Sequence, residues 1–259
     1  MIEKELCRSV ESKNVHTEPT WEFNTHVPSG LSEAEVHVWV ATVPAPTAVA
    51  NLERILSPDE VARSERYHKL ESAASFIVAR AILRVLLAEY LATTPSSIRF
   101  AYSATGRPSV EYPRTDVDVS IAHSAKAILI GATRCRRLGV DIEYISPTFD
   151  FSEVVASAFG QEERMILESG KDSQRRRLFF ALWTAREALA KACGAGLTAP
   201  LSELGLSLKY SVEGAVQVTH RNAEPHQCVG LTPLPSYAAA VAYTGPACVA
   251  RLLSYPGVS

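Results

Sequence analysis

The segment from Trp183 to Lys191 constrains this chain more than any other part of its sequence. It lies in a run that predicts a long helix over residues 173–193, with Trp183, Glu187 and Lys191 spaced four residues apart. Residues at this spacing line one face of an α-helix. An aromatic ring, a carboxylate and an ammonium group on one stripe can hold an anionic substrate together with a metal ion.

Two further carboxylates lie upstream in an extended apolar run. Asp141 and Glu143 are two residues apart, so a strand over 139–144 presents both on one face, with Val140 and Ile142 on the other. With Glu187 they would make a plausible Mg²⁺ site, because Mg²⁺ favours carboxylate oxygens completed by phosphate and water.

Each of these signals also has a plainer interpretation when it is taken alone. A half-solvated strand often carries acids on its polar face. A glutamate four residues before a lysine is a common stabilising helix pair, worth about 0.2–0.5 kcal/mol.

Composition narrows the class of protein. The chain has 259 residues, 47% of them hydrophobic, which is enough for one large domain or two small ones. Its 26 basic and 28 acidic residues give a net charge of −2, without the broad basic footprint of a nucleic-acid binder. Five scattered cysteines with no CxxC pair argue against a zinc site or a disulfide framework.

The sequence also predicts where the protein works. Residues 1–25 lack the apolar core of a signal peptide. No run approaches the ~20 apolar residues that a membrane helix needs. We therefore expect a soluble, cytoplasmic protein that does not bind membranes.

The pattern of elements predicts an α+β fold with two similar halves and a site in the crevice between them. We expect a flexible extension over 1–32, an N-terminal half over 33–115 and a C-terminal half over 116–259. Ser57, Pro58 and Glu60 are a helix start. The other expected helices cover 72–91, 151–159, 161–167 and 173–193. The expected strands cover 37–43, 98–102, 117–121, 127–133, 139–144, 205–210, 215–219, 227–231 and 238–243, with those over 117–144 forming an antiparallel meander.

Several isolated residues gain meaning from their order along the chain. Arg80 and Arg84 share a helix face, and Arg80 sits among apolar residues, where a guanidinium needs an anionic partner such as a carboxylate or a phosphate. Gly106-Arg107-Pro108 is a weak turn signal. His123, followed by Ser124 at the end of a strand, would alone be structural.

Together these signals resemble the Sfp-type 4′-phosphopantetheinyl transferases. The resemblance covers about Val36 to Tyr243 and is most specific in Gly-Val-Asp-Ile-Glu followed by Trp-x-x-Arg-Glu-Ala-x-x-Lys-x-x-Gly-x-Gly-Leu. It implies an enzyme that moves the 4′-phosphopantetheine arm of coenzyme A onto a serine of an apo acyl or peptidyl carrier protein. It further implies Mg²⁺ dependence, release of adenosine 3′,5′-bisphosphate and a monomeric state.

The resemblance also implies roles for individual residues. The metal-binding acids would be Asp141, Glu143 and Glu187. The catalytic residues would be Glu187, as general base for the carrier serine, with Lys191 and Asp141. Coenzyme A would be bound by Arg63, Arg80, Arg107, Pro108, His123, Ser124 and Lys191, with Arg63, Arg80 and His123 at its 3′-phosphate, Arg107 and Pro108 beside the adenine and Lys191 at the phosphates.

The chain departs from the family pattern at two sites and in its N-terminal extension. Arg186 stands where lysine is commoner, and Ala122 stands where a hydroxyl is often found before the histidine. Two other functions stay open at this point. A metal-dependent phosphohydrolase would use the same acids, and an inactive coenzyme A-binding protein would use the same arginines. The carrier served cannot be read from the residues.

Overall fold

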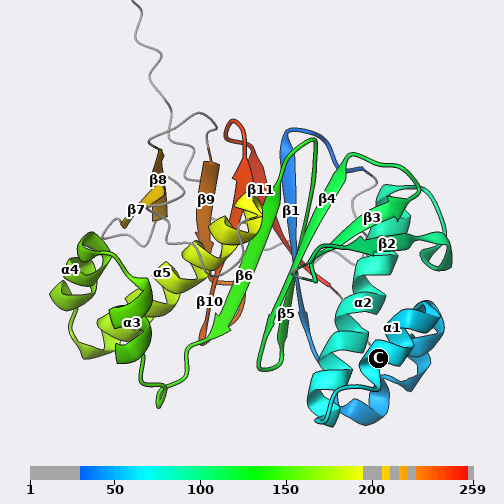
Figure 1. The fold of residues 1–259 in the computed structure, drawn as a ribbon, viewed down its shortest axis with the longest axis horizontal. Coiled ribbons are helices and arrows are strands. Elements are labelled where there is room, and N and C mark those ends of the chain that lie inside the picture. The colour runs from blue at the N-terminus through cyan, green and yellow to red at the C-terminus, as the bar shows by residue number, and fades with distance from the viewer. Residues whose placement is uncertain (1–29, 105, 195–205, 211–215, 221–225, 256–259) are drawn as a thin grey trace, which may run out of the picture.

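In a computed structural model of the chain, residues 30–104, 106–194, 206–210, 216–220 and 226–255 are described, and they form a layered α and β protein (Figure 1). The predicted mixed fold class is confirmed. Most of the predicted extension over 1–32 lies outside the described residues. No helix among the described residues is long and apolar enough to span a membrane.

Five α-helices are described, and each was predicted to within a few residues. Ser57 begins the first as its N-cap, and its N–H donates to Glu60 Oε2 at 3.0 Å in a capping box. Gly194, with a φ of 71°, ends the last in the left-handed conformation that glycine adopts most easily. The helices are α1 (Pro58–Ser64), α2 (Leu70–Tyr90), α3 (Ser152–Ala158), α4 (Gln161–Ser169) and α5 (Asp172–Cys193).

The described strands form two main sheets and two hairpins. One sheet has the order β11-β1-β5-β4 and the other β6-β10-β9, while β2 pairs with β3 and β7 with β8. The strands are β1 (Glu35–Thr42), β2 (Arg99–Tyr102), β3 (Pro108–Tyr112), β4 (Val117–Ser124), β5 (Ala127–Arg134), β6 (Leu138–Tyr144), β7 (Leu206–Tyr210), β8 (Val216–His220), β9 (His226–Leu231), β10 (Tyr237–Thr244) and β11 (Val249–Ser254). Strands β3 and β11 were not predicted.

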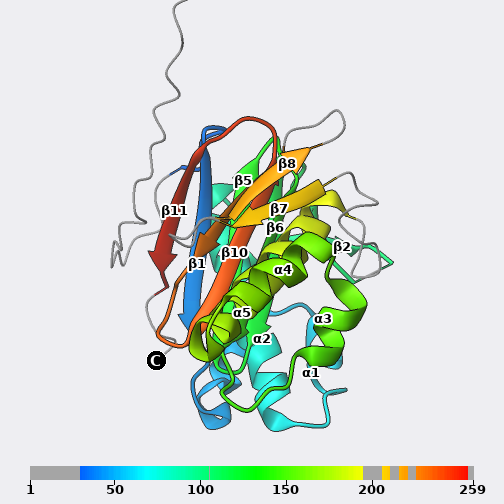
Figure 2. The same cartoon turned by 90° about the vertical axis from the view of Figure 1, so that its left-hand side faces the viewer.

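The two main sheets pack against each other, and each carries a long helix on its outer side. Helix α2 covers the four-stranded sheet, and α5 covers the three-stranded sheet (Figure 2). Apolar side chains between the sheets form a separate core, to which β6 contributes Leu138, Val140 and Ile142. The alternating face of β6, which carries Gly139, Asp141 and Glu143, therefore turns towards α5, and Asp141 and Glu143 share a face as the sequence predicted.

The predicted meander is wrong at its third strand. Strands β4 and β5 pair as an antiparallel hairpin, but β6 leaves their sheet and pairs with β10. The reason is packing. A Cβ at Gly131 of β5 would lie 2.6 Å from Val140 Cγ1, so β6 crosses over β5 and its side chains pack there. The alternation of apolar and polar residues in β6 is compatible with pairing in the sheet of β4 and β5 or in the sheet of β10. The two placements differ only in their long-range pairing.

Side chains of β4, rather than a backbone ladder, join the two sheets. Three residues of β4 accept hydrogen bonds from β6 backbone N–H groups, each twenty positions ahead: Asp118 from Leu138 (2.9 Å), Ser120 from Val140 (3.1 Å) and Ser124 from Tyr144 (3.0 Å). We call Asp118, Ser120 and Ser124 with these three N–H groups the seam. Ala122 lies on the same face of β4, between Ser120 and Ser124, and has no hydroxyl to accept a hydrogen bond.

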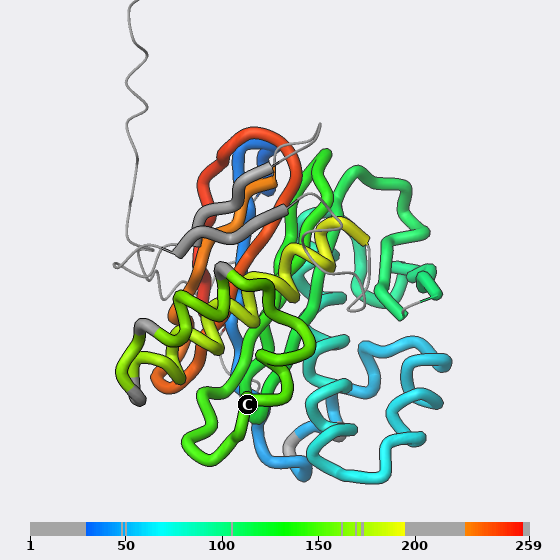
Figure 3. The backbone as a smooth tube through the Cα atoms, turned by 60° about the vertical axis from the view of Figure 1, so that its left-hand side comes forward, coloured from blue at the N-terminus to red at the C-terminus, as the bar shows by residue number. Residues whose placement is uncertain are grey.

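The predicted division at residue 115 stays a prediction. The four-stranded sheet contains strands from both sides of this division, because β1 precedes residue 115 and β4, β5 and β11 follow it. Figure 3 nevertheless shows α1 and α2 gathered on one side of the molecule and α3, α4 and α5 on the other.

Candidate active site

A pocket of about 380 Å³ lies where β4 of the four-stranded sheet meets α2 and the C-terminal part of α5. Seven of the predicted site residues contribute to its lining. These are Arg63, Arg80, Arg107, Pro108, His123, Glu187 and Lys191. The pocket thus brings together residues from α1, α2, the turn between β2 and β3, β4 and α5, which lie far apart in the sequence.

One end of the pocket is aromatic and positively charged. Arg80 on α2 is only 5% exposed, and its guanidinium carbon lies 5.3–5.8 Å from the ring centroids of Phe76, Phe100 and Tyr102. The Arg63 guanidinium carbon also lies 5.4 Å from the Phe76 ring centroid. Burial lowers the pKa of Arg80, and its Nη1 has no hydrogen-bond partner. A buried guanidinium with an unused donor is suited to an anion.

The neighbouring Arg84 differs from Arg80 in that its donors are used within the protein. It donates to Glu60 Oε2 at 2.7 Å and to the carbonyls of Pro95 and Ile98 at 2.8 and 2.9 Å. The second oxygen of Glu60 has no hydrogen bond and lies 4.0 Å from Arg80 Nε. Glu60 therefore neutralises Arg84 and leaves Arg80 with an incomplete partner.

The other end of the pocket is lined by Glu187 and Lys191, and the charges of Asp141 and Glu143, which do not line the pocket themselves, act on Glu187 there. We call this the acidic end. Lys191 Nζ donates to Asp141 Oδ1 at 2.7 Å and to the Val140 carbonyl at 3.0 Å. Burial raises the pKa of Asp141 to about 6, although Lys191 opposes the shift. Burial, and then the negative charge of Asp141, raise the pKa of Glu187 to about 7. These shifts are typical of carboxylates that crowd one another at a functional site.

The acidic end fits a divalent cation. Asp141 Oδ2 is buried without a hydrogen-bond partner, and the charge of Glu143 also acts on both Asp141 and Glu187. Oxygen donors of this kind are the ligands that Mg²⁺ prefers. The carboxylate oxygens of Asp141, Glu143 and Glu187 lie farther apart than the ligand atoms of the compact group described below. Lys191 donates a hydrogen bond to one Asp141 oxygen.

Gly139 sets the distance between β6 and α5. A Cβ at this position would lie 1.9 Å from the Ala188 carbonyl oxygen and 2.8 Å from Lys191 Cβ. No other residue permits so close an approach of strand and helix. It is this approach that places Lys191 within reach of Asp141.

Ser124 and His123 lie at the end of β4, beside the acids. Ser124 Oγ donates to Glu143 Oε2 at 2.6 Å, so it orients a predicted metal ligand. His123 is exposed and lines the pocket. Binding of coenzyme A by these two residues stays a prediction.

Arg107 and Pro108 also line the pocket, but the Arg107 guanidinium is turned into the protein. It donates to backbone carbonyls and to Asp118, as described further below. The predicted position of this pair beside the adenine stays a prediction.

Sequence reasoning missed two residues that support the site. Glu163 on α4 receives both contacts of Arg186 Nη1, each at 2.9 Å, and this buried pair fixes α4 against α5 next to Glu187. Arg186 alone would have been assigned to solvent. The available signal was Glu163, three residues after Gly160 at the start of a helix. This spacing is typical of a helix cap, so it did not indicate an ion pair with Arg186.

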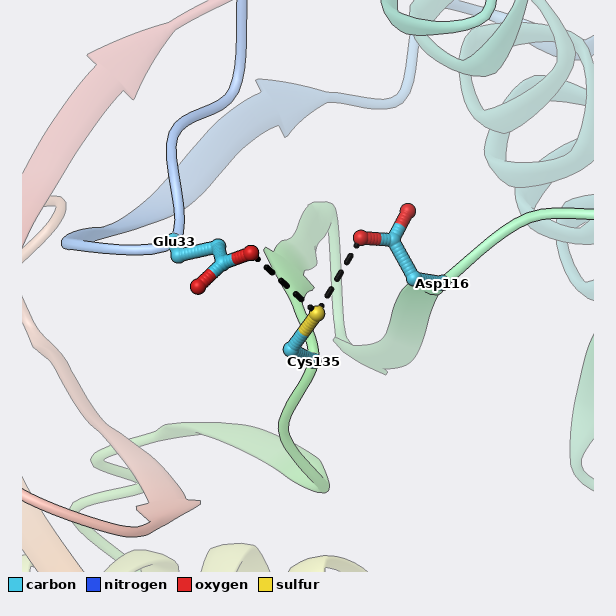
Figure 4. A group of neighbouring side chains, drawn as sticks. All are labelled: Glu33, Asp116 and Cys135. Atoms are coloured by element: carbon cyan, nitrogen blue, oxygen red, sulfur yellow. Dashed lines mark hydrogen bonds between the residues drawn. The ribbon is translucent and has the colours of Figure 1, made fainter.

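The compact group of possible metal-ligand atoms lies elsewhere. Among the described residues, Glu33, Asp116 and Cys135 bring such atoms within 4.8 Å of one another at the exposed start of the β5–β6 connection (Figure 4). The Cys135 thiol donates to Asp116 Oδ2 at 3.2 Å, and this bond raises the pKa of Cys135 to about 11. Arg134 also pairs with Asp116. The group is thus satisfied as a protonated thiol between carboxylates.

The site therefore combines buried cationic and buried acidic side chains in and beside one pocket, an arrangement that is typical of an enzyme active site. Comparison with known proteins shows the family to which the chain belongs. The sequence model of the 4′-phosphopantetheinyl transferase superfamily matches residues 137–242. The chain is 31% identical over 218 residues to the 4′-phosphopantetheinyl transferase HetI of Nostoc sp. (strain PCC 7120 / SAG 25.82 / UTEX 2576), covering 83% of this chain and 90% of that protein.

Two weaker similarities were also found. The chain is 23% identical over 164 residues to the 4′-phosphopantetheinyl transferase Sfp of Bacillus subtilis (strain 168), covering 63% of this chain and 71% of that protein. A holo-(acyl-carrier-protein) synthase of Bacillus anthracis str. Ames, solved in complex with CoA (3′,5′-ADP), is 17% identical with a TM-score of 0.35, covering 41% of this chain and 93% of that one. The chain belongs to the 4′-phosphopantetheinyl transferase superfamily, which confirms the predicted family and enzyme class.

Proposed function

We propose that this enzyme transfers the 4′-phosphopantetheine arm of coenzyme A to a serine of an apo acyl or peptidyl carrier protein and releases adenosine 3′,5′-bisphosphate. The observation that carries the proposal is the pocket itself, which has Arg63 and Arg80 at one end and Glu187 and Lys191 at the other. Coenzyme A carries a 3′-phosphate and a pyrophosphate, so it presents anionic groups to both ends.

The positive end would hold the 3′-phosphate. Arg80 offers its unused Nη1 within an aromatic wall, and Arg63 and His123 line the same space. A charge-assisted hydrogen bond made away from water is strong and directional. Binding energy gained there, remote from the bond that breaks, would align the pyrophosphate for reaction.

The acidic end would carry out the transfer. Asp141, Glu143 and Glu187 would hold Mg²⁺, which when bound would supply positive charge to the pyrophosphate oxygens. Lys191 would add its own charge there, since charge builds on those oxygens as the serine attacks the β-phosphate. Glu187, with its pKa raised to about 7, is suited to accept the serine proton, either directly or through a water that it orients.

The test is the intact mass of an apo carrier protein after incubation with the enzyme, coenzyme A and Mg²⁺. We expect a gain of one phosphopantetheine arm that disappears when Mg²⁺ is chelated or when the acceptor serine is replaced by alanine. Release of adenosine bisphosphate without any carrier would instead identify a phosphohydrolase. Tight coenzyme A binding with no transfer to fatty-acid, polyketide or peptide carriers would identify an inactive binder.

Two further predictions belong to this proposal. The enzyme acts as a monomer in the cytoplasm, where coenzyme A and apo carriers are synthesised and meet. Light scattering of the purified protein tests the monomeric state, because a dimer would have twice the expected mass.

A further inference from the structure

Arg107 reaches from the turn between β2 and β3 across the pocket wall and donates to four oxygens of the protein. Its Nη2 donates to Asp118 Oδ2 at 2.7 Å, to the Leu138 carbonyl at 2.6 Å and to the Val119 carbonyl at 3.3 Å. Its Nη1 donates to the carbonyl of Lys191. One side chain therefore contacts β4, β6 and α5 together.

The contact with Lys191 lies at a special place in α5. Lys191 is in the last turn of the helix, where carbonyl groups lack partners within the helix and carry partial negative charge. A guanidinium there satisfies such a carbonyl and is stabilised by the helix dipole. The Gly194 N–H, at 3.2 Å, is the other donor to the same oxygen.

Lys191 is thereby held from two sides. Its backbone is fastened by Arg107, and its side chain is fastened by Asp141 and Val140. Asp118 fixes Arg107 in turn, and it also accepts the Leu138 N–H at the end of the seam. The chain of contacts runs from Asp118 through Arg107 to the backbone of Lys191, and from there to the acidic end of the pocket.

We infer that Arg107 is a positioning residue that places Lys191, rather than a residue that binds the nucleotide. The inference rests on the proposed function. Asp118 separates the two roles, because it holds the Arg107 guanidinium but is not among the residues that line the pocket. Losing Asp118 should therefore have the same effect as losing Arg107 only if Arg107 acts through Lys191.

The experiment compares Arg107→Ala, Asp118→Ala and the double variant in the carrier assay, with separate measurement of kcat and of KM for coenzyme A. We expect kcat to fall about 10- to 100-fold in each, because small displacements of a positioned group have effects of this size. The KM for coenzyme A should stay near the wild-type value. The double variant should be no slower than the slower single variant, since both remove one connection.

Hydrogen exchange supplies a readout that does not need activity. Peptides from the last turn of α5 should exchange faster in Arg107→Ala and Asp118→Ala than in the wild type. Arg134→Ala is the matched control, because Arg134 also donates to backbone carbonyls, those of Leu31 and Tyr90, but does not line the pocket. If the alanine variants fail to fold, Arg107→Lys and Asp118→Asn provide the same comparison, and Arg107→Lys should restore part of kcat.

A raised KM for coenzyme A in Arg107→Ala, with unchanged kcat and a normal Asp118→Ala, would overturn the inference and make Arg107 a nucleotide-binding residue. Unchanged exchange in the last turn of α5 would overturn it as well. A wild-type enzyme that transfers nothing would refute the proposed function instead, and the exchange data would then decide the role of Arg107 by themselves.

Discussion

At one end of the pocket the buried Glu60 lies beside two arginines, whereas at the other end Lys191 pairs with Asp141, and the charges of Lys191, Asp141 and Glu143 all act on Glu187. Each end thus buries an excess of one charge, which lowers stability unless a ligand compensates it. The buried pair of Arg186 and Glu163, by contrast, is matched in charge. The comparison teaches that the positive end is suited to an anionic group and the acidic end to a cation.

Glu187→Gln tests the acidic end and should have the largest effect. We expect transfer to fall by about 10²- to 10⁴-fold, the usual contribution of a general base, while the fold is kept because the two side chains have the same shape. Carrier mass and circular dichroism measure the two quantities. Glu168→Gln, at an exposed position on α4, is the control. Transfer near the wild-type rate would remove Glu187 from both the base and the metal site.

Arg84→Ala tests the balanced part of the positive end. It leaves Glu60 buried beside a partner 4.0 Å away, so unfolding free energy should fall by about 3–5 kcal/mol. Arg80→Ala should cost clearly less, because Arg80 has the unused donor. Denaturant titration of both variants gives the comparison. Equal losses would mean that Arg80 is as structural as Arg84.

His37 is a third buried ionisable group, and it differs from the two ends of the pocket because it stays uncharged near neutral pH. His37 is buried, contacts the Tyr90 hydroxyl at 2.8 Å, and has its pKa lowered to about 4 by burial, with Glu35 opposing this and Arg251 adding to it. The unfolded chain, with an ordinary pKa near 6.5, binds the proton first as pH falls. Stability should therefore be complete above pH 6.5 and decrease towards pH 4, by about 3 kcal/mol in total.

Denaturation midpoints between pH 7.5 and pH 4.5 measure this loss. In His37→Gln the part of the pH dependence that comes from this window should disappear, leaving the contribution of the carboxylates. An identical pH profile for the variant and the wild type would show that His37 does not titrate in the way its burial requires.

Arg80→Ala tests the unbalanced part of the positive end through its ligand. Affinity for coenzyme A should fall at least about 10-fold more than affinity for dephospho-coenzyme A, because a hydrogen bond to a charged group contributes about 1.5–3 kcal/mol. Titration calorimetry with both ligands measures the ratio, and the exposed Arg66→Ala is the control. The same loss for both ligands would separate Arg80 from the 3′-phosphate.

The serine positions of the seam carry no charge, and substitutions there should give the smallest effect. By the spacing of the seam, a hydroxyl at position 122 would face the Ile142 N–H, so Ala122→Ser should raise unfolding free energy by at most about 1 kcal/mol. Ser120→Ala removes an existing partner of the Val140 N–H and should act in the opposite direction. A decrease in both variants would show that space rather than hydrogen bonding limits this joint.

Local rules predicted the helices and their ends, as the capping box at Ser57 and the glycine end of α5 show. Alternation predicted that Asp141 and Glu143 share a face. What failed depends on long-range pairing: β6 beside β10, the strand β11, and the partners of Arg107 and Arg186. A guanidinium can reach a carbonyl 84 positions away, and no local pattern contains that information.

The parallel pairing of β1 with β11 has a consequence for the order of synthesis. Residues 35–40 pair with residues 249–254, so one edge of β1 stays open until more than two hundred further residues have left the ribosome. An apolar strand with a free edge is a site for wrong pairing and aggregation during that interval. The sheet that supports α2 and the positive end of the pocket is therefore completed late. Deleting β11 should damage the part of the site encoded earliest in the chain.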